Sequence, residues 1–244
     1  MLMLRSGSSW SDKIRKLLRE VLVIVLIAIF AAVLKFANKD DDRLHLATLQ
    51  VLEHIRYTQH LAMSDNKFDP KDNTYNLHIN KKGPNGRWFY SRWQIWFRQN
   101  SKHMLYVIFS DKNRGGNFDY VPTLETARDP LTGEVMAHRL PTEIGYKNEN
   151  EYNNENFDLT AKYGIVDIAT KNCNQESISP SKARIVFDEK GRPYGGISAL
   201  DNKNAYFFRI TKECDITFTA DTGKTATIRI YPESGYAEIL NIEQ

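Results

Sequence analysis

The sequence predicts an α+β fold: a long N-terminal helix, with a membrane half and an amphipathic half, packed on an antiparallel β-domain. Two observations predict it. An apolar stretch near the N-terminus continues into an amphipathic pattern, and no Pro or Gly occurs between Gly7 and Pro70 to break a helix there. Beyond Met63, alternating β-branched and aromatic residues are separated by Gly, Asn and Asp, as is typical of antiparallel strands.

The apolar half of the predicted helix is centred on Val21–Leu34, fourteen consecutive residues without a charge or a strong polar group. That length is typical of a signal peptide and is shorter than the roughly 20 residues that span a bilayer. However, the apolar pattern continues through Phe36 and Ala37, with Lys35 able to reach the interface, and helical periodicity follows. No small-x-small cleavage site stands cleanly at its end, so we expect a retained anchor. A removed signal peptide and a buried soluble helix are the alternatives.

Charge predicts the orientation of this anchor. Residues 1–20 carry five basic and two acidic residues, and the rest of the chain carries 28 of each. Basic residues before an apolar segment stay on the cytoplasmic side. We therefore expect a single-pass inner-membrane protein with a cytoplasmic N-terminus and a periplasmic C-terminal domain.

The predicted organisation has four parts: a cytoplasmic basic tail (1–20), a transmembrane half of the helix (21–37), an amphipathic half (38–64) and a periplasmic β-rich domain (65–244). Residues 112–171 have few strand signals and are expected to form long loops. The expected strands are Trp88–Arg98, Leu105–Ser110, Ala183–Asp188, Ala205–Thr211, Asp215–Thr219, Thr225–Tyr231 and Tyr236–Leu240.

The cysteine content fits an extracytoplasmic domain. Cys173 and Cys214 are the only cysteines, and an even count outside the cytoplasm indicates a disulfide. A pair of unconnected buried thiols is the alternative. A metal site is not expected, because the two cysteines are far apart in sequence and have no clustered His.

The sequence contains no recognisable catalytic motif. Its six histidines form no HExxH or HxH pattern, no glycine-rich loop has the residues of a phosphate cradle, and the serines near 180 have no neighbouring His. We expect a non-enzymatic protein without a cofactor or a metal. An anchored enzyme would need an acid–base pair that only the fold brings together.

A basic and aromatic cluster suggests one alternative function. Residues 79–110 contain six basic residues and no acidic one. In an alternating strand Trp93, Ile95 and Phe97 would face the core, and the opposite row could hold a phosphate backbone and stack a base. A half-buried strand with a basic outer face is the other interpretation, and the neutral charge of the domain favours it. The candidate DNA-binding residues are Lys81, Lys82, Arg87, Arg92, Trp96 and Arg98, with Gln94 in the same row.

An acidic and asparagine-rich segment, Glu143–Asp158, could bind calcium outside the cytoplasm. It lacks the spacing of an EF-hand, and its glycine, Gly145, precedes most of the acids. We expect a solvated loop.

Several motifs, in their order along the chain, resemble those of type IV pilin-like proteins, and most closely the minor pseudopilins of the H type. They are the apolar segment Leu22–Val33, the helix Leu52–Met63, the FDxxGR hairpin within Ala183–Pro193, and the closing strands around Cys214–Thr219 and Ile228–Tyr236.

The resemblance implies a non-catalytic subunit of a type II secretion pseudopilus or a type IV pilus. Such a subunit packs helix against helix with other pilin-like subunits, and contacts membrane lipid and the inner-membrane assembly machinery. It also implies that Glu20 is an assembly residue. The chain departs from the family signature before the apolar run, because Arg15 and Lys16 stand where the Gly and the Phe of the processing site belong.

Overall fold

A computed structural model describes residues 10–69, 88–112, 114, 125–138, 153–173, 181–196 and 206–243. Within residues 10–41 it describes the side chains of 15, 17, 18, 21, 22 and 25 alone. The chain divides into two compact units, Met1–Asp42 and Arg43–Gln244.

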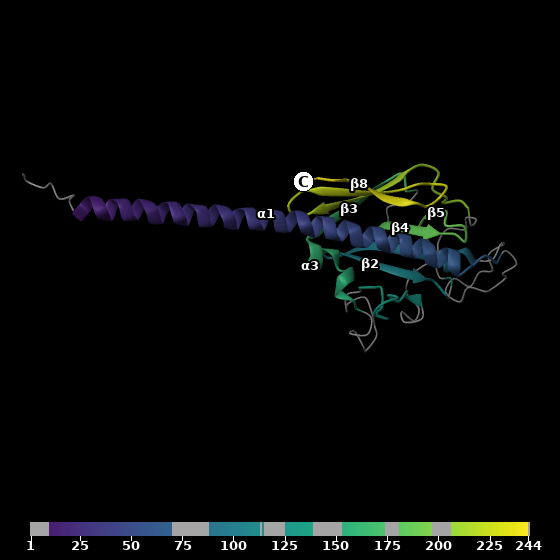
Figure 1. The fold of residues 1–244 in the computed structure, drawn as a ribbon. Coiled ribbons are helices and arrows are strands. Elements are labelled where there is room, and N and C mark those ends of the chain that lie inside the picture. Colours follow the sequence, from purple (N-terminus) through teal and green to yellow (C-terminus); the bar gives the residue numbers. More distant parts are fainter. Residues whose placement is uncertain are drawn as a thin grey trace, which may run out of the picture. The chain divides into compact units, whose positions relative to one another are not determined.

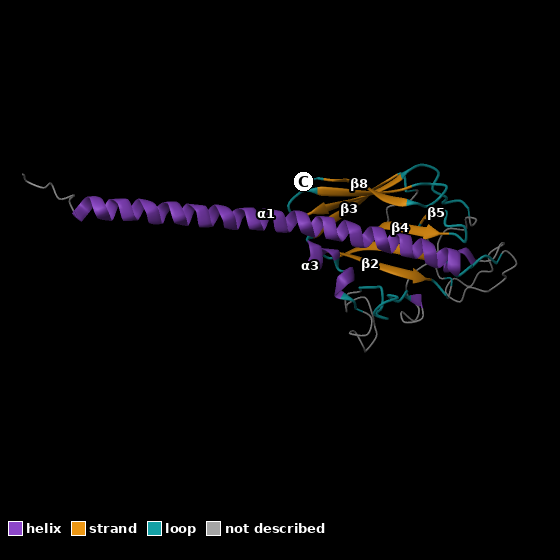
Figure 2. Ribbon diagram, viewed as in Figure 1, coloured by secondary structure: helices purple, strands orange, loops and turns teal. Residues whose placement is uncertain are grey.

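The second unit contains two antiparallel sheets of four strands each (Figures 1 and 2). The first sheet has the order β2-β1-β4-β5 and the second the order β3-β6-β7-β8. The first contains β1 (Trp93–Asn100), β2 (His103–Ser110), β4 (Ser181–Phe187) and β5 (Pro193–Gly195). The second contains β3 (Ile165–Lys171), β6 (Cys214–Ala220), β7 (Thr225–Ile230) and β8 (Ala237–Ile242). Short helices are η1 (Trp88–Ser91), η4 (Glu155–Phe157) and α3 (Leu159–Tyr163).

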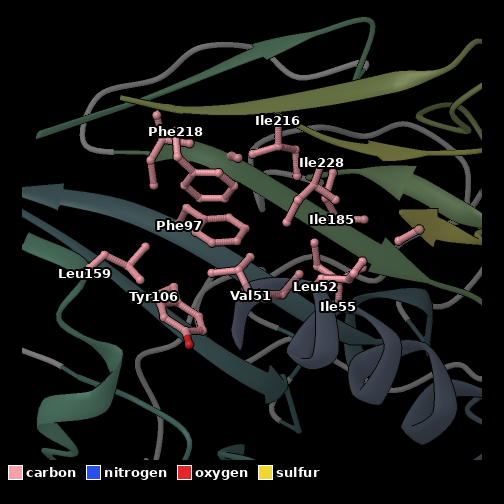
Figure 3. Close-up of a cluster of buried hydrophobic side chains, with 14 of the residues drawn as sticks. Val51, Leu52, Ile55, Phe97, Tyr106, Leu159, Ile185, Ile216, Phe218 and Ile228 are labelled. Atoms are coloured by element: carbon pink, nitrogen blue, oxygen red, sulfur yellow. The ribbon is translucent and has the colours of Figure 1, made fainter. Parts of the chain in front are cut away.

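Helix α1 runs from Trp10 to Ser64, and its last part belongs to the second unit. Leu44, Val51 and Ile55 are at most 1% exposed and recur at helical spacing, so one face of this part is buried. Figure 3 shows Val51, Leu52 and Ile55 directed toward side chains of both sheets. The rings of Phe97 and Phe218, whose centres are 5.9 Å apart, join the sheets within this core.

The predicted fold class is wrong. The second unit is mainly β, and α1 enters it only from Arg43 onward, so no long helix with a membrane half is packed on a β-domain. The physical reason lies in residues 38–42, Asn-Lys-Asp-Asp-Asp. This segment contains no apolar residue to bury against a sheet, and Leu44 is the first buried residue among the described side chains of the helix.

The predicted location is also wrong. Among the helical residues that the structure describes, none form a segment with both the length and the apolarity that crossing a membrane requires. This overturns the single-pass inner-membrane anchor with its cytoplasmic N-terminus and periplasmic domain. The uncharged run between Glu20 and Lys35 is fourteen residues. At 1.5 Å per residue it spans roughly 21 Å, less than the roughly 30 Å of a hydrocarbon core.

Most of the predicted strands are confirmed. β2, β4, β6, β7 and β8 lie close to the expected ranges, whereas Trp88–Ser91 is a 3₁₀ helix. The segment expected as a strand at 205–211 holds a turn and one bridge, from Arg209 to Tyr194. β3 lies inside the region expected to be loops. Asp167 interrupts its apolar residues, so the sequence lacks a regular strand pattern. The strand forms by antiparallel pairing with β6.

The disulfide expected from the sequence is present. Cys173 and Cys214 are bonded, and they link the end of β3 to the start of β6. Both residues are buried, at 3% and 0% exposure. The bond therefore reinforces the pairing of the edge strand β3 with its neighbour.

Gln59 of α1 ties the helix to one turn from each sheet. Its Nε2 donates to the carbonyl oxygen of Gly191, between β4 and β5, at 2.9 Å, and to that of Ser234, between β7 and β8, at 2.7 Å. Gly191 and Gly235 have φ angles of 76° and 65°, which favour glycine. One side chain of the helix thus holds the two sheets together at this end.

Candidate functional site

The N-terminal part of α1 exposes a group of large apolar side chains. Their exposed fractions range from 47% to 64%. The apolar residues are Leu17, Leu18, Val21, Leu22 and Val25, which we call the α1 apolar segment. Glu20, the predicted assembly residue, lies within it on the helix, but its side chain is outside the described residues. Contiguous exposed apolar surface is typical of a protein interaction site.

The part of α1 in the second unit has two different faces. The inner face is buried in the core, whereas Leu46, Leu49 and Glu53 lie exposed on the outer face. Leu46 is 53% exposed and Leu49 is 37% exposed. We call Leu46, Leu49 and Glu53 the α1 outer face. It places two leucines in solvent, whereas Leu44, Val51 and Ile55 of the same part of the helix are buried.

The predicted DNA-binding row does not form an exposed surface. As expected, Ile95 and Phe97 face the core, both at 0% exposure. On the opposite side, however, Arg92 and Gln94 are also buried, at 2% and 1%. The guanidinium carbon of Arg92 lies 4.7 Å from the ring centre of Trp88 and 4.6 Å from that of Tyr194. Arg92 is therefore enclosed by aromatic rings.

Trp96 and Arg98 take part in a second stack on the same side of β1. The guanidinium carbon of Arg98 is 4.5 Å from the Trp96 ring centre, and that of Arg184 on β4 is 5.0 Å from it. Arg184 Nε also donates to Gln94 Oε1 at 2.6 Å. Burial lowers the pKa of Arg184 to about 10, although nearby Asp111 opposes this shift. Lys81, Lys82 and Arg87 lie outside the described residues.

Apolar side chains of β2 and of a neighbouring segment cover part of this side of the sheet. Isolated bridges join Val107 to Ala137 and Phe109 to Thr126, so the segment 125–138 packs along β2. Val107, Phe109 and Ala137 form a buried cluster with Trp96 against it. Alternation of apolar and polar residues indicates a strand with one buried face. In β1, however, side chains on both faces are covered.

The fold does bring titratable residues together around Asp158. Its Oδ2 accepts from His103 Nδ1 at 2.7 Å, and His138 Nε2 lies 4.0 Å away. Its Oδ1 accepts from the amide of Ala161, so Asp158 caps the start of α3. Asp158 thereby joins α3 to β2, with which it also makes a bridge at Leu105.

The segment proposed as a possible calcium loop is described only from residue 153 onward. Within that part, Glu155 is exposed and Asp158 is engaged in the cap. Glu143, Gly145, Glu149 and Glu151 lie outside the described residues. In the described ranges no group of three or more His, Cys, Asp or Glu side chains has a metal-binding arrangement.

A second polar network lies between α1 and the first sheet. His54 Nδ1 is 2.8 Å from the hydroxyl oxygen of Tyr106, and Gln50 Nε2 donates to that oxygen at 2.6 Å. Tyr163 donates to Gln50 Oε1 at 2.6 Å. Burial lowers the pKa of His54 from 6.5 to about 4, with Asp129 opposing the shift and Lys162 adding to it. His54 is therefore neutral in the folded protein near pH 7.

The lowered pKa of His54 predicts a loss of stability in mild acid. Between pH 6.5 and 4 the unfolded chain binds a proton at this position and the folded chain does not, so stability falls as the pH falls. One group with this shift contributes a loss of about 2 kcal/mol between pH 7 and pH 5. Urea unfolding at both values should show this loss reduced in His54→Gln. In His60→Gln, which removes an exposed histidine of the same helix, it should remain; equal losses in the parent and His54→Gln would contradict the prediction.

No family model, curated protein or solved structure matches this chain. Its function must therefore be inferred from its own residues.

Sequence patterns did not indicate that Arg184 and Asp158 organise contacts between distant segments. Arg184 lies 90 residues after the Gln94 to which it donates, and Asp158 lies 55 residues after His103. The signal for Asp158 was local: an Asp three residues before Ala161 in a short helical pattern is an N-cap signature. For Arg184 no local pattern distinguishes a buried arginine from an exposed one.

Proposed function

We propose that this chain is a non-catalytic structural subunit that assembles by helix–helix packing through the α1 apolar segment, as a subunit of a pseudopilus or a type IV pilus. The observation that carries the proposal is the exposure of that segment, from Leu17 to Val25. Burial of such side chains between helices is the main favourable term in association. The partners are other pilin-like subunits and their assembly machinery, as the ordered motifs imply.

A structural role accounts for the polar clusters that the fold creates. The carboxyl group of Asp158 caps α3, and the Gln50–Tyr106–His54 network joins α1 to β2. Each side chain in these clusters has a bonding partner within the fold. Their contacts order the second unit, so the proposal assigns them no reaction.

DNA binding, the alternative function, has less support from the geometry. A nucleic-acid surface requires guanidinium groups that can reach phosphates. Arg92 is 2% exposed between Trp88 and Tyr194, and Arg98 lies over Trp96. We therefore do not propose it.

The proposal is tested by the association of the purified full-length chain. We expect oligomers in sedimentation velocity and filaments or short rods by electron microscopy. The double variant Val21→Glu/Val25→Glu should sediment as a monomer, because it places charges where the helices pack.

A matched control places the same charges at exposed apolar residues of the second sheet. Val166 and Leu240 are 44% and 47% exposed, close to Val21 and Val25 at 49% and 47%. Val166→Glu/Leu240→Glu should leave the oligomers unchanged. A monomeric parent chain, or an equal effect of the two double variants, would overturn the proposal.

A further inference from the structure

The segment Asn153–Tyr163, which contains η4 and α3, packs against the part of α1 that belongs to the second unit. The ring of Phe157 stacks on that of His54, with ring centres 5.0 Å apart and planes 11° from parallel. Gln50 Nε2 donates to the carbonyl oxygen of Asn156 at 2.7 Å. We call Asn153–Tyr163 the α3 segment. Its stacked ring and its hydrogen bonds fasten it to one side of α1.

A chain of hydrogen bonds between the α3 segment, α1 and β2 has one direction. Tyr163 donates to Gln50 Oε1 at 2.6 Å, and Lys162 Nζ donates to the same oxygen at 3.3 Å. Gln50 Nε2 in turn donates to the Tyr106 hydroxyl oxygen at 2.6 Å. The hydrogen of Tyr106 is then directed toward His54 Nδ1, 2.8 Å away. The chain therefore ends on an unprotonated ring nitrogen of His54.

A proton on His54 Nδ1 is incompatible with this chain. It would set an N–H of the ring against the O–H of Tyr106. Tyr106 is 1% exposed, so its hydroxyl group cannot turn to water instead. The ring of Phe157 covers one face of the imidazole, so water has little access to a charge there. Separating Phe157 from His54 would let water reach the protonated ring.

The charges around His54 do not overcome this cost. Burial is the largest cause of its lowered pKa, about 4; Asp129 opposes the shift, and Lys162 of the α3 segment adds to it. On α1, Glu53 and Arg56 pair with each other at 2.9 Å. A proton on His54 therefore favours separation of the α3 segment from α1.

The contact of the α3 segment with β2 responds to acid in the opposite way. Asp158 Oδ2 accepts from His103 Nδ1 at 2.7 Å, and His138 Nε2 lies 4.0 Å from the same oxygen. A proton on either imidazole makes it a cation beside the carboxylate, and charge-assisted hydrogen bonds are the stronger ones. A backbone bridge between Asp158 and Leu105 also holds this end. Acid therefore leaves the α3 segment attached to β2.

We propose that the α3 segment is an acid-released latch: protonation of His54 frees it from α1, while Asp158 keeps it on β2. Gln50 and His54 lie one and two helical turns after Leu46. Release of the latch therefore extends the α1 outer face with side chains that are covered at neutral pH. These contacts lie within one copy of the chain, so they do not depend on the proposed assembly.

Hydrogen exchange of the full-length chain, followed by mass spectrometry at pH 7 and pH 5, tests the latch. Protection is corrected for the intrinsic pH dependence of exchange. The α3 segment should be less protected than β6 and β7 at both pH values, because it opens without unfolding of the sheets. Its protection should fall about 20-fold between pH 7 and pH 5, because the open state takes up a proton on His54.

Two variants assign this fall to His54. In His54→Gln it should shrink to about threefold or less, because glutamine keeps an acceptor for Tyr106 and takes up no proton. His60→Gln removes an exposed histidine of the same helix and should keep the full fall. A full fall that persists in His54→Gln would overturn the proposal.

Urea distinguishes local opening from global unfolding in the parent chain, without any substitution. Opening of the α3 segment exposes little surface, so its exchange should depend weakly on urea, whereas that of β6 and β7 should depend strongly on it. If the α3 segment had the protection and the urea dependence of β6 and β7, it would open only with the whole unit, and the latch would be overturned.

The attachment to β2 has a separate test. His103→Gln should lower the protection of the α3 segment more at pH 5 than at pH 7, because it removes a partner of Asp158 that acid makes cationic. An equal loss at the two pH values would show that His103 does not hold the segment in acid, and would overturn this part of the proposal.

Discussion

Replacing Asp188 with alanine is expected to lower the free energy of unfolding by about 4 to 5 kcal/mol. Its carboxylate is 0% exposed and accepts hydrogen bonds from the amides of Lys190 and Arg192, from the Arg192 side chain and from the Tyr194 hydroxyl. Alanine would leave all four donors without their acceptor. Urea unfolding of the full-length variant, compared with the parent chain at equal concentration, measures the loss.

Two variants identify the cause of the Asp188 effect. Asp188→Asn keeps an acceptor for the turn amides and removes the charge, so it should cost clearly less than alanine. Asp215→Ala breaks a similar two-contact ion pair, with Arg229 at 2.7 and 2.9 Å, on the more exposed face of the second sheet. It should cost much less. A loss from Asp215→Ala equal to that from Asp188→Ala would contradict the role of burial.

Replacing Gly235 with alanine is expected to destabilise the second unit by about 4 kcal/mol or more. A Cβ at this position would lie 2.1 Å from the carbonyl oxygen of Gly191 and 2.5 Å from Gln59 Nε2. The Gly191 oxygen is a backbone atom, so no rotamer change relieves the contact. The turn between β7 and β8 would have to separate from the turn between β4 and β5, and Gln59 would lose its acceptors. Thermal and urea unfolding measure this loss.

Gly223 supplies the matched control for Gly235. Its φ is 84°, so alanine is disfavoured there too, but nothing lies within 4 Å of a Cβ. Gly223→Ala should therefore cost only about 1 to 2 kcal/mol, the ordinary cost of a left-handed conformation. Equal losses of stability in Gly223→Ala and Gly235→Ala would show that the close approach of the two turns does not contribute to the loss at Gly235.

The predicted effects at Asp188 and Gly235 give a structural reason for the FDxxGR motif, one of the motifs that resemble pilin-like proteins. In the segment Phe187-Asp-Glu-Lys-Gly-Arg192, Asp188 holds the turn through its carboxylate, Gly191 adopts the positive φ and Arg192 neutralises the charge. Each motif residue has a partner within the turn or on α1. This pattern indicates a requirement for folding, and a surface partner is not needed to account for it.

Sequence patterns gave correct predictions for structural features that depend on residues close together in the chain. Strand β6 alternates buried and half-buried positions, and the turn formers after Met63 end α1 near the predicted place. Turn chemistry and side-chain alternation depend on neighbours within a few residues. The cysteine pair was predictable for another reason, because two cysteines allow a single intramolecular bond.

Sequence by itself determined the order of the β-strands along most of the second unit, the end of the helix, the disulfide and the charge pattern of α1. Only the tertiary structure decided that Arg92 and Arg184 are enclosed by rings, that Asp158 joins α3 to β2, and that Leu46 and Leu49 stay exposed. The physical reason is that burial depends on which distant segments pack together. Trp88 and Tyr194 enclose Arg92, and Val107, Phe109 and Ala137 pack against Trp96, so no pattern within β1 records the cover on its outer side.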